Sequence, residues 1–242
     1  MKIVNDQAII LAAMDYRDTD RIVTLFCRDH GKVSALARGG RKSRKRFGGA
    51  LELFARLNIT LALKDSLSAL GDCDILTVHP QIRADFTSIA HASYACELTS
   101  ALLPENLPNP RLFRLLAAYL DHLDSGAAEP ADRHFFEMNL LNILGYRPPV
   151  ESCAGCGTPL AETGCLWGVD WCLCSDCARG LSGERLSPAA VALLLTSLKT
   201  GRIGNSSFNG TAGAEAGHFL DRFIATLLPR PLKSLHFLRL SP

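Results

Sequence analysis

Two pairs of cysteines have the spacing of a metal site. Cys153 and Cys156 form one Cys-x-x-Cys pair, and Cys174 and Cys177 form a second pair further along the chain. Each pair can offer two thiolates from one tight turn, and the double pattern is typical of a zinc ribbon. Four thiolates complete a closed tetrahedral shell that leaves no position for water. The spacing therefore predicts one structural zinc ion per chain, and four reduced cysteines without metal are the alternative.

The other five cysteines do not suggest a disulfide framework. Cys27, Cys73 and Cys96 stand alone, whereas Cys165 and Cys172 lie between the two pairs and can substitute as ligands. An odd total with a metal-like cluster is typical of a reducing compartment. The chain starts without the apolar run of a signal peptide, and no segment offers the roughly 18 uncharged apolar residues of a membrane-spanning helix. We therefore expect a soluble, cytosolic protein.

Positive charge is concentrated in one short segment. Residues 28–46 contain eight cations and a single acid, for a net charge of +7, although the whole chain carries only +2. The densest part holds Arg38, Arg41, Lys42, Arg44, Lys45 and Arg46. Because acids are too sparse to neutralise these cations, we expect them to bind a nucleic-acid backbone, with a solvated charged surface as the alternative. Only Phe47 and Phe54 lie near enough in the sequence to stack on a base, so we expect phosphate contacts to dominate and sequence specificity to be weak.

No catalytic motif accompanies these features. The sequence has no G-x-S-x-G, no H-E-x-x-H, no P-loop and no G-x-G-x-x-G fingerprint. Asp15, Asp18 and Asp20 can in principle hold Mg²⁺, as in a nuclease, but a turn between strands explains them more simply. We therefore expect a binding protein rather than an enzyme. A zinc-ribbon RNA-binding or ribosome-associated protein is the main alternative to a DNA-binding one.

The N-terminal part has the alternation of β-strands. Apolar and mostly polar residues alternate over residues 51–64 and again over residues 32–38, and residues 22–26 and 70–76 are shorter candidates. About five strands in so short a stretch predict a small barrel. The basic run falls between two of the strands and is flanked by glycine pairs, so we expect a mobile loop at the barrel mouth over residues 39–49.

After residue 80 the apolar period becomes helical. We expect helices over residues 81–103, from Pro110 to Gly126, from Pro130 to Gly145 and from Pro188 to Gly201. A last helix is expected around residues 219–228, and residues 205–213 are expected to form a loop. The cysteine-rich stretch interrupts this helical region.

Several short segments, taken in their order along the chain, resemble the RecO recombination mediators of bacteria. The segments are residues 20–26, 31–33, 37–46 and 51–54, then residues 142–146 ahead of the first cysteine pair, and residues 232–234 near the end. The resemblance implies an α+β protein with an N-terminal OB-fold β-barrel, an α-helical domain and an inserted zinc ribbon. The implied boundaries are 1–79 for the barrel, 80–150 and 183–242 for the helical domain, and 151–182 for the ribbon.

What the resemblance implies about activity is DNA repair without covalent chemistry. Members of this family bind single- and double-stranded DNA, anneal complementary strands, bind the acidic C-terminal tail of the single-stranded-DNA-binding protein, and act with RecR to help load RecA. They are cytoplasmic and associated with the bacterial nucleoid. Carried over, Arg38, Arg41, Lys42, Arg44, Lys45 and Arg46 match the basic DNA-binding loop, and Cys153, Cys156, Cys174 and Cys177 match the zinc positions.

Overall fold

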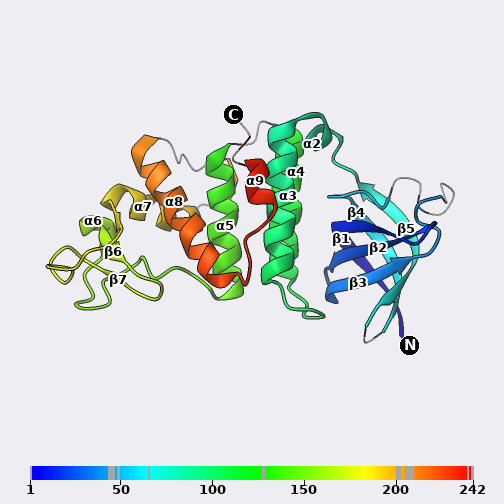
Figure 1. Cartoon of the computed structure of the whole chain (residues 1–242), viewed down its shortest axis with the longest axis horizontal. Coiled ribbons are helices and arrows are strands. Elements are labelled where there is room, and N and C mark those ends of the chain that lie inside the picture. Colours follow the sequence, from blue (N-terminus) through cyan, green and yellow to red (C-terminus); the bar gives the residue numbers. More distant parts are fainter. Residues whose placement is uncertain are drawn as a thin grey trace. The chain divides into compact units, whose positions relative to one another are not determined.

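The computed structural model describes residues 2–42, 47, 50–64, 66–126, 129–199, 203–204, 210–238 and 240. The chain divides into two units, one made of Met1–Ala127 with Leu232–Pro242 and the other of Ala128–Pro231 (Figure 1). The first unit holds a β-barrel and helices, and the second holds further helices and a small sheet. None of the helices in the described part of the chain is both long enough and apolar enough to cross a membrane.

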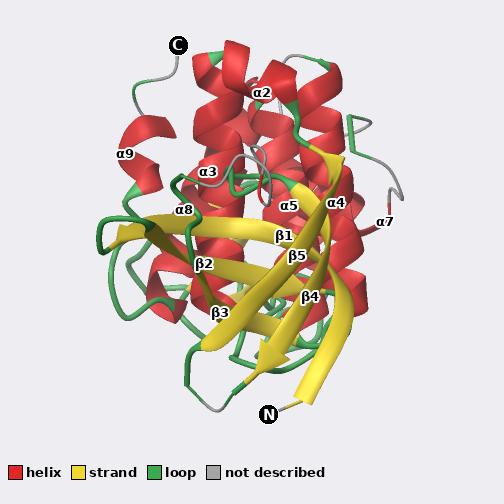
Figure 2. Cartoon of the chain, turned by 90° about the vertical axis from the view of Figure 1, so that its right-hand side faces the viewer, coloured by secondary structure: helices red, strands yellow, loops and turns green. Residues whose placement is uncertain are grey.

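Five strands of the first unit close into a barrel (Figure 2). They are β1 (Lys2–Tyr16), β2 (Asp20–Cys27), β3 (Gly31–Ala37), β4 (Arg56–Leu63) and β5 (Ser68–Thr77). The order around the barrel is β1-β2-β3-β5-β4, and every pairing is antiparallel except the short parallel contact between β3 and β5. This five-stranded barrel is an OB-fold, so the predicted fold class of an OB-fold barrel followed by a helical part is confirmed.

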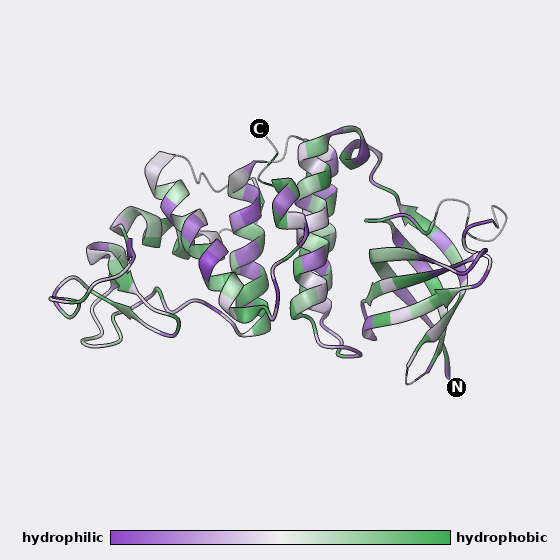
Figure 3. Cartoon of the chain, in the orientation of Figure 1, coloured by the Kyte–Doolittle hydropathy of each residue, from purple (hydrophilic) through white to green (hydrophobic). Residues whose placement is uncertain are grey.

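Alternation along the strands fills the barrel interior. In β3, Val33, Ala35 and Ala37 are buried in the barrel core, whereas the residues between them are only half-buried. The partner of Ala35 on β2 is Val23, which belongs to the same core. Hydrophobic and hydrophilic positions can be followed along the strands in Figure 3. Because successive side chains point to opposite faces of a strand, this register also fixes which residues lie on the outer surface.

The strand predicted over residues 51–64 is too long at its N-terminal end. β4 begins at Arg56, and Phe54 has a left-handed backbone with φ of 71°. The N–H of Phe54 donates to the carbonyl of Ile10, and the N–H of Ile10 donates to the carbonyl of Ala55. These bonds form next to a β-bulge in β1 and turn the chain, so Phe54 is buried although the alternation places it on the polar face.

The helices of the first unit are α2 (Pro80–Ala84), α3 (Phe86–Leu102), α4 (Pro110–Ser125) and α9 (Ser234–Leu238). The expected helix over residues 81–103 is therefore two helices. Asp85 separates them in an extended conformation, and its carboxylate accepts a hydrogen bond from the N–H of Ser88, which caps α3. The helix expected from Pro110 is confirmed, with Asn109 as its cap.

Buried polar contacts join the barrel to these helices. His79 is only 1% exposed; its Nδ1 lies 3.0 Å from the carbonyl oxygen of Phe54 and its Nε2 lies 3.0 Å from Asp121 on α4.

At the C-terminal end of the unit, the Glu97 carboxylate on α3 accepts hydrogen bonds from the N–H groups of Lys233 and Ser234. Glu97 thus caps α9 and holds it against α3.

The second unit packs α5 (Pro130–Leu144), α7 (Pro188–Lys199) and α8 (Gly210–Leu227) around an apolar interior and adds the short helix α6 (Leu160–Thr163). Its small sheet has the order β7-β6-β8, made of β6 (Cys165–Trp167), β7 (Cys172–Leu173) and β8 (Arg185–Leu186). Trp167 packs edge-on against Phe219 of α8, with ring centroids 5.0 Å apart. The loop expected over residues 205–213 is wrong for residues 210–213, which are helical, and residues 205–209 lie outside the described part.

Candidate nucleic-acid interface and metal centre

The basic segment, residues 38–46, starts where β3 ends, beside the turn between β1 and β2. The N–H of Gly39 donates to the Asp20 carboxylate at 2.8 Å, and the N–H of Arg41 donates to the carbonyl of Thr19 at 3.0 Å. Gly39 has φ of 72°, which a residue without a Cβ adopts without strain. The first residues of the segment are therefore bound to the β1–β2 turn by backbone hydrogen bonds.

Acidic residues of this turn hold the basic segment. Asp15 lies 3.3 Å from the Arg41 guanidinium and 2.9 Å from that of Arg21. The hydrogen bond from the Gly39 N–H holds the pKa of Asp20 below its ordinary value. These contacts give Asp15 and Asp20 a positioning role, which differs from the magnesium site considered from the sequence.

The described cations of residues 28–46 differ in whether another group of the protein already binds them. Arg28 is paired with Asp29 at 2.9 Å, and the Lys32 ammonium donates to the carbonyl of Ser100 at 2.7 Å. Arg38 and Lys42 are exposed, and neither has an ion-pair partner among the residues that the structure describes. Arg41 is also exposed and shares Asp15 with Arg21. The other three predicted binding residues, Arg44, Lys45 and Arg46, lie outside the described residues.

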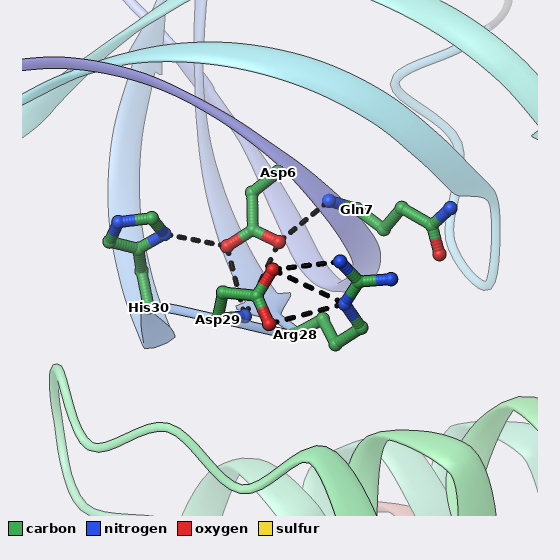
Figure 4. A network of polar contacts seen from close by, with 5 residues as sticks. All are labelled: Asp6, Gln7, Arg28, Asp29 and His30. Carbon is green, nitrogen blue, oxygen red and sulfur yellow. Dashed lines mark hydrogen bonds and ion pairs between the residues drawn. The ribbon is translucent and has the colours of Figure 1, made fainter.

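The opposite end of β2 has the reverse charge. The buried Asp6 carboxylate accepts hydrogen bonds from the N–H groups of Gln7 and Asp29 and lies 2.7 Å from Nδ1 of His30 (Figure 4). This network fixes the β2–β3 turn. Asp6 and Asp29 line a shallow pocket together with Asp72 and Asp74. Arg28 also lines this pocket, but the four carboxylates outnumber its single guanidinium, so the pocket disfavours a phosphate backbone.

The expectation that Phe47 and Phe54 can stack on a base is wrong. Phe47 is 3% exposed and Phe54 is 4% exposed, and Phe47 belongs to the barrel core. Sequence analysis instead missed Tyr16, which is half-buried at the β1–β2 turn. Tyr16 is remote from the basic segment in sequence, and only the pairing of β1, β2 and β3 brings it close.

The four paired cysteines converge in the second unit, as predicted from their spacing. The sulfur atoms of Cys153, Cys156, Cys174 and Cys177 all lie within 4.8 Å of one another, and those of Cys156 and Cys174 are 3.6 Å apart. A tetrahedral site with zinc–sulfur bonds of about 2.3 Å places its sulfur atoms about 3.8 Å apart. The cluster is therefore of the right size for one metal ion, and these four thiols can bind it.

Backbone hydrogen bonds prepare the thiols for metal binding. The N–H groups of Cys174 and Gly155 donate to the sulfur of Cys153, and the first of them is the main cause that lowers the pKa of Cys153 to about 6. A hydrogen bond with the Thr158 hydroxyl lowers the pKa of Cys156. A Cβ on Gly155 would lie 3.1 Å from the sulfur of Cys177, so the turn packs tightly against the second pair. Metal ligands must be thiolates, and these contacts favour thiolates at Cys153 and Cys156, whereas hydrogen bonding with the neighbouring sulfurs, that of Cys156 first, raises the pKa of Cys177 to about 12.

The two remaining cysteines of this region lie outside the cluster. Cys165 on β6 and Cys172 on β7 are buried, and neither belongs to the group of four sulfur atoms. The structure therefore separates the ligand set from the two candidates that the sequence left open. Cys165 and Cys172 are buried in the small sheet, where their side chains hydrogen-bond to each other.

Comparisons with known proteins find similarity to one family along nearly the whole chain. Residues 1–79 match the family model described as Recombination protein O N terminal, and residues 83–236 match Recombination protein O C terminal. The chain is 52% identical over 235 residues to the DNA repair protein RecO of Geobacter sulfurreducens, covering 96% of each chain. It is 47% identical to the protein of the same name from Geobacter metallireducens, covering 99% of this chain and 98% of that one. A more distant relative, from Myxococcus xanthus, is 36% identical and covers 98% of each chain.

Proposed function

The chain belongs to the RecO family of DNA repair and recombination proteins, and from that premise we propose that it is a mediator that binds and anneals DNA strands. The observation that carries the proposal is the polarity of the barrel. At one end of β2, Arg38 and Lys42 are exposed and have no ion-pair partner among the described residues, and at the other end four carboxylates line a pocket. OB-folds bind oligonucleotides on this part of the barrel. Arg41, Arg44, Lys45 and Arg46 complete the proposed DNA-binding set.

The proposed mechanism of annealing is electrostatic. Two complementary strands repel each other because each carries a chain of phosphates. Cations of the basic segment replace the counterions of a bound strand and so lower the barrier to an encounter with the second strand. The mechanism needs no nucleotide hydrolysis. Phosphate contacts carry little sequence information, which suits a protein that must act on any strand.

We further propose that the four-cysteine cluster binds one zinc ion with a structural role. Four thiolates leave no open position for water or substrate, so the ion would stabilise the ribbon and not act as a catalyst. Cys153, Cys156, Cys174 and Cys177 would hold it. Metal analysis of protein purified without chelator should give one zinc per chain, and a protein with no bound metal would contradict this proposal.

The proposed partners follow from family membership. They are RecR, the acidic C-terminal tail of the single-stranded-DNA-binding protein and, indirectly, RecA, with single- and double-stranded DNA as ligands. The tail would hold the mediator on coated strands, where the basic segment then meets DNA. A bacterial cytoplasmic, nucleoid-associated location fits this role.

One experiment tests the annealing activity and the proposed acidic-tail partner together. Two complementary oligonucleotides are coated with the single-stranded-DNA-binding protein, either intact or without its acidic tail, and annealing is followed without nucleotide. We expect annealing on coated strands that depends on the tail. Annealing of naked strands but not of coated strands would contradict the mediator role and would indicate a general DNA-binding protein. Failure on both, with tighter binding to RNA than to DNA, would overturn the proposal in favour of an RNA-binding protein.

A further inference from the structure

The barrel has one aromatic side chain that it does not bury. The aromatic residues of the OB-fold are Tyr16, Phe26, Phe47 and Phe54, and all four lie among the described residues. The three phenylalanines are at most 4% exposed, whereas Tyr16 is half-buried at the end of β1. An aromatic ring at the surface of a nucleic-acid-binding barrel is a place where a base can stack.

A planar side-chain group lies over one face of the Tyr16 ring. The guanidinium carbon of Arg17 lies 5.2 Å from the ring centroid, which is the geometry of a cation–π contact. The neighbouring side chain reaches this face because Arg17 has a left-handed backbone, with φ of 54°. The guanidinium therefore occupies this face of the ring, and a bound base would displace it or stack on its outer side.

An apolar strip continues from Tyr16 across the outer face of three strands. Met14 pairs with Ile22 on β2, and Ile22 pairs with Leu36 on β3, so the three side chains lie side by side. Met14 is 60% exposed, and Ile22 and Leu36 are half-buried. Met14 and Tyr16 are two residues apart on β1 and therefore point to the same face.

The other end of the same outer face is covered. There Phe26 pairs with Ile9, and both are fully buried. Phe113 of α4 packs edge-on against Phe26, with ring centroids 5.6 Å apart. The outer face of β1 and β2 is therefore covered by a helix at one end and exposed at the end that carries Met14 and Tyr16.

The charges around the exposed end suit a nucleic acid. Asp20, the strand partner of Tyr16, accepts the hydrogen bond that fixes Gly39 at the start of the basic segment. The positive charges of Arg17 and Arg38 both lie near Asp20 and help to lower its pKa. Stackable and apolar surface thus lies directly beside cations, the combination by which single-stranded nucleic acids are bound.

We propose that Tyr16, with the strip of Met14, Ile22 and Leu36, binds the unpaired bases of a single strand whose phosphates contact the described cations Arg38, Arg41 and Lys42. This inference rests on the proposed function, because it names how that DNA site treats the bases. It also separates single strands from duplex DNA, since bases in a duplex are stacked on each other and do not reach a flat protein surface. The strip would hold bases apart from their neighbours until a complementary strand pairs with them.

The test compares two ligands that share a backbone. Fluorescence anisotropy measures the affinity of the full-length protein for a labelled oligothymidine and for an abasic oligonucleotide of equal length. Tyr16→Ala should lower the affinity for oligothymidine by about fivefold or more and change the abasic affinity by less than about twofold. Tyr16→Phe should keep the wild-type preference, because the ring is retained. Tyr146→Ala removes a tyrosine that is 45% exposed in the other unit and serves as the matched control.

The outcomes separate this inference from the proposal on which it rests. Equal losses for both ligands in Tyr16→Ala would overturn base stacking, and so would no loss for either ligand. Arg38→Ala should weaken both ligands to the same extent, which supports the phosphate site independently of the stacking site. If the wild-type protein binds neither ligand, the proposed DNA site itself is wrong. Thermal unfolding of each variant shows whether the fold is retained.

Discussion

Removing the two unpaired cations should change the salt dependence of DNA binding by a predictable amount. Arg38 and Lys42 are exposed and have no ion-pair partner among the described residues, so each is free to contact one phosphate. On single strands, each such contact contributes about 0.7 to the slope of log affinity against log salt. The double variant Arg38→Ala and Lys42→Ala should therefore have a slope smaller by about 1.4, and each single variant by about 0.7.

The difference is large enough to measure. A slope difference of about 1.4 means that, between 50 and 200 mM salt, the wild-type protein loses about sevenfold more affinity than the double variant. Anisotropy titrations of a labelled single strand at four or five salt concentrations give the slopes directly. The slope is a better measure than one affinity, because it counts released counterions and is insensitive to small changes in folding.

Arg28→Ala is the matched control for this prediction. Arg28 belongs to the same cationic run and its removal changes the net charge by the same amount as each single variant. It is, however, paired with Asp29 beside the acidic pocket at the other end of β2. Its removal should leave the slope unchanged. A slope that falls as much in Arg28→Ala as in Arg38→Ala would refute the argument, because binding would then follow total charge rather than position.

Three further predictions concern other contacts. The Gly39 N–H holds the pKa of Asp20 below 3.8, so the hydrogen bond between Gly39 and Asp20 should persist at neutral pH and be lost as the pH falls below about 4. Asp20→Ala removes the bond that fixes the start of the basic segment and should weaken DNA binding at pH 7, as measured by anisotropy. Cys174→Ser should abolish zinc binding by metal analysis and lower the melting temperature, while the salt slope of DNA binding stays unchanged because the barrel lies in the other unit. Glu97→Ala should lower the free energy of unfolding by about 1 kcal/mol in denaturant titrations, because it removes the cap of α9, and Glu97→Gln should lower it less.

Features that depend on short sequence spacing could be predicted well. Each Cys-x-x-Cys pair was recognised as two neighbouring thiols because its spacing fits one tight turn, and the helix from Pro110 begins where Asn109 caps it. Strand alternation predicted the barrel interior because burial on one face of a strand needs only a period of two. In each case the information lies within a few residues of the feature.

Features that depend on distant residues could not be predicted in this way. Phe54 is buried because it bonds to Ile10 at a bulge in another strand, and the alternation around it gives no sign of that contact. Tyr16 reaches the basic segment only through the register of β1 with β2 and of β2 with β3. The sequence therefore offered Phe47 and Phe54 as the residues able to stack on a base, although both are buried.

The acids of the barrel explain how a chain of nearly neutral charge can bind a polyanion at one place. Asp15 and Asp20 engage Arg41 and a backbone N–H, and Asp20 also lies near Arg38, so these acids fix the start of the basic segment while Arg38 stays exposed. Asp72 and Asp74 lie with other carboxylates at the far end of β2. Under the proposed function, a phosphate chain would be attracted to the first end and repelled by the second, and both effects would act over about one Debye length at physiological salt. The net charge of +2 for the whole chain therefore conceals two oppositely charged ends of the barrel, and their separation along β2 would orient a bound strand.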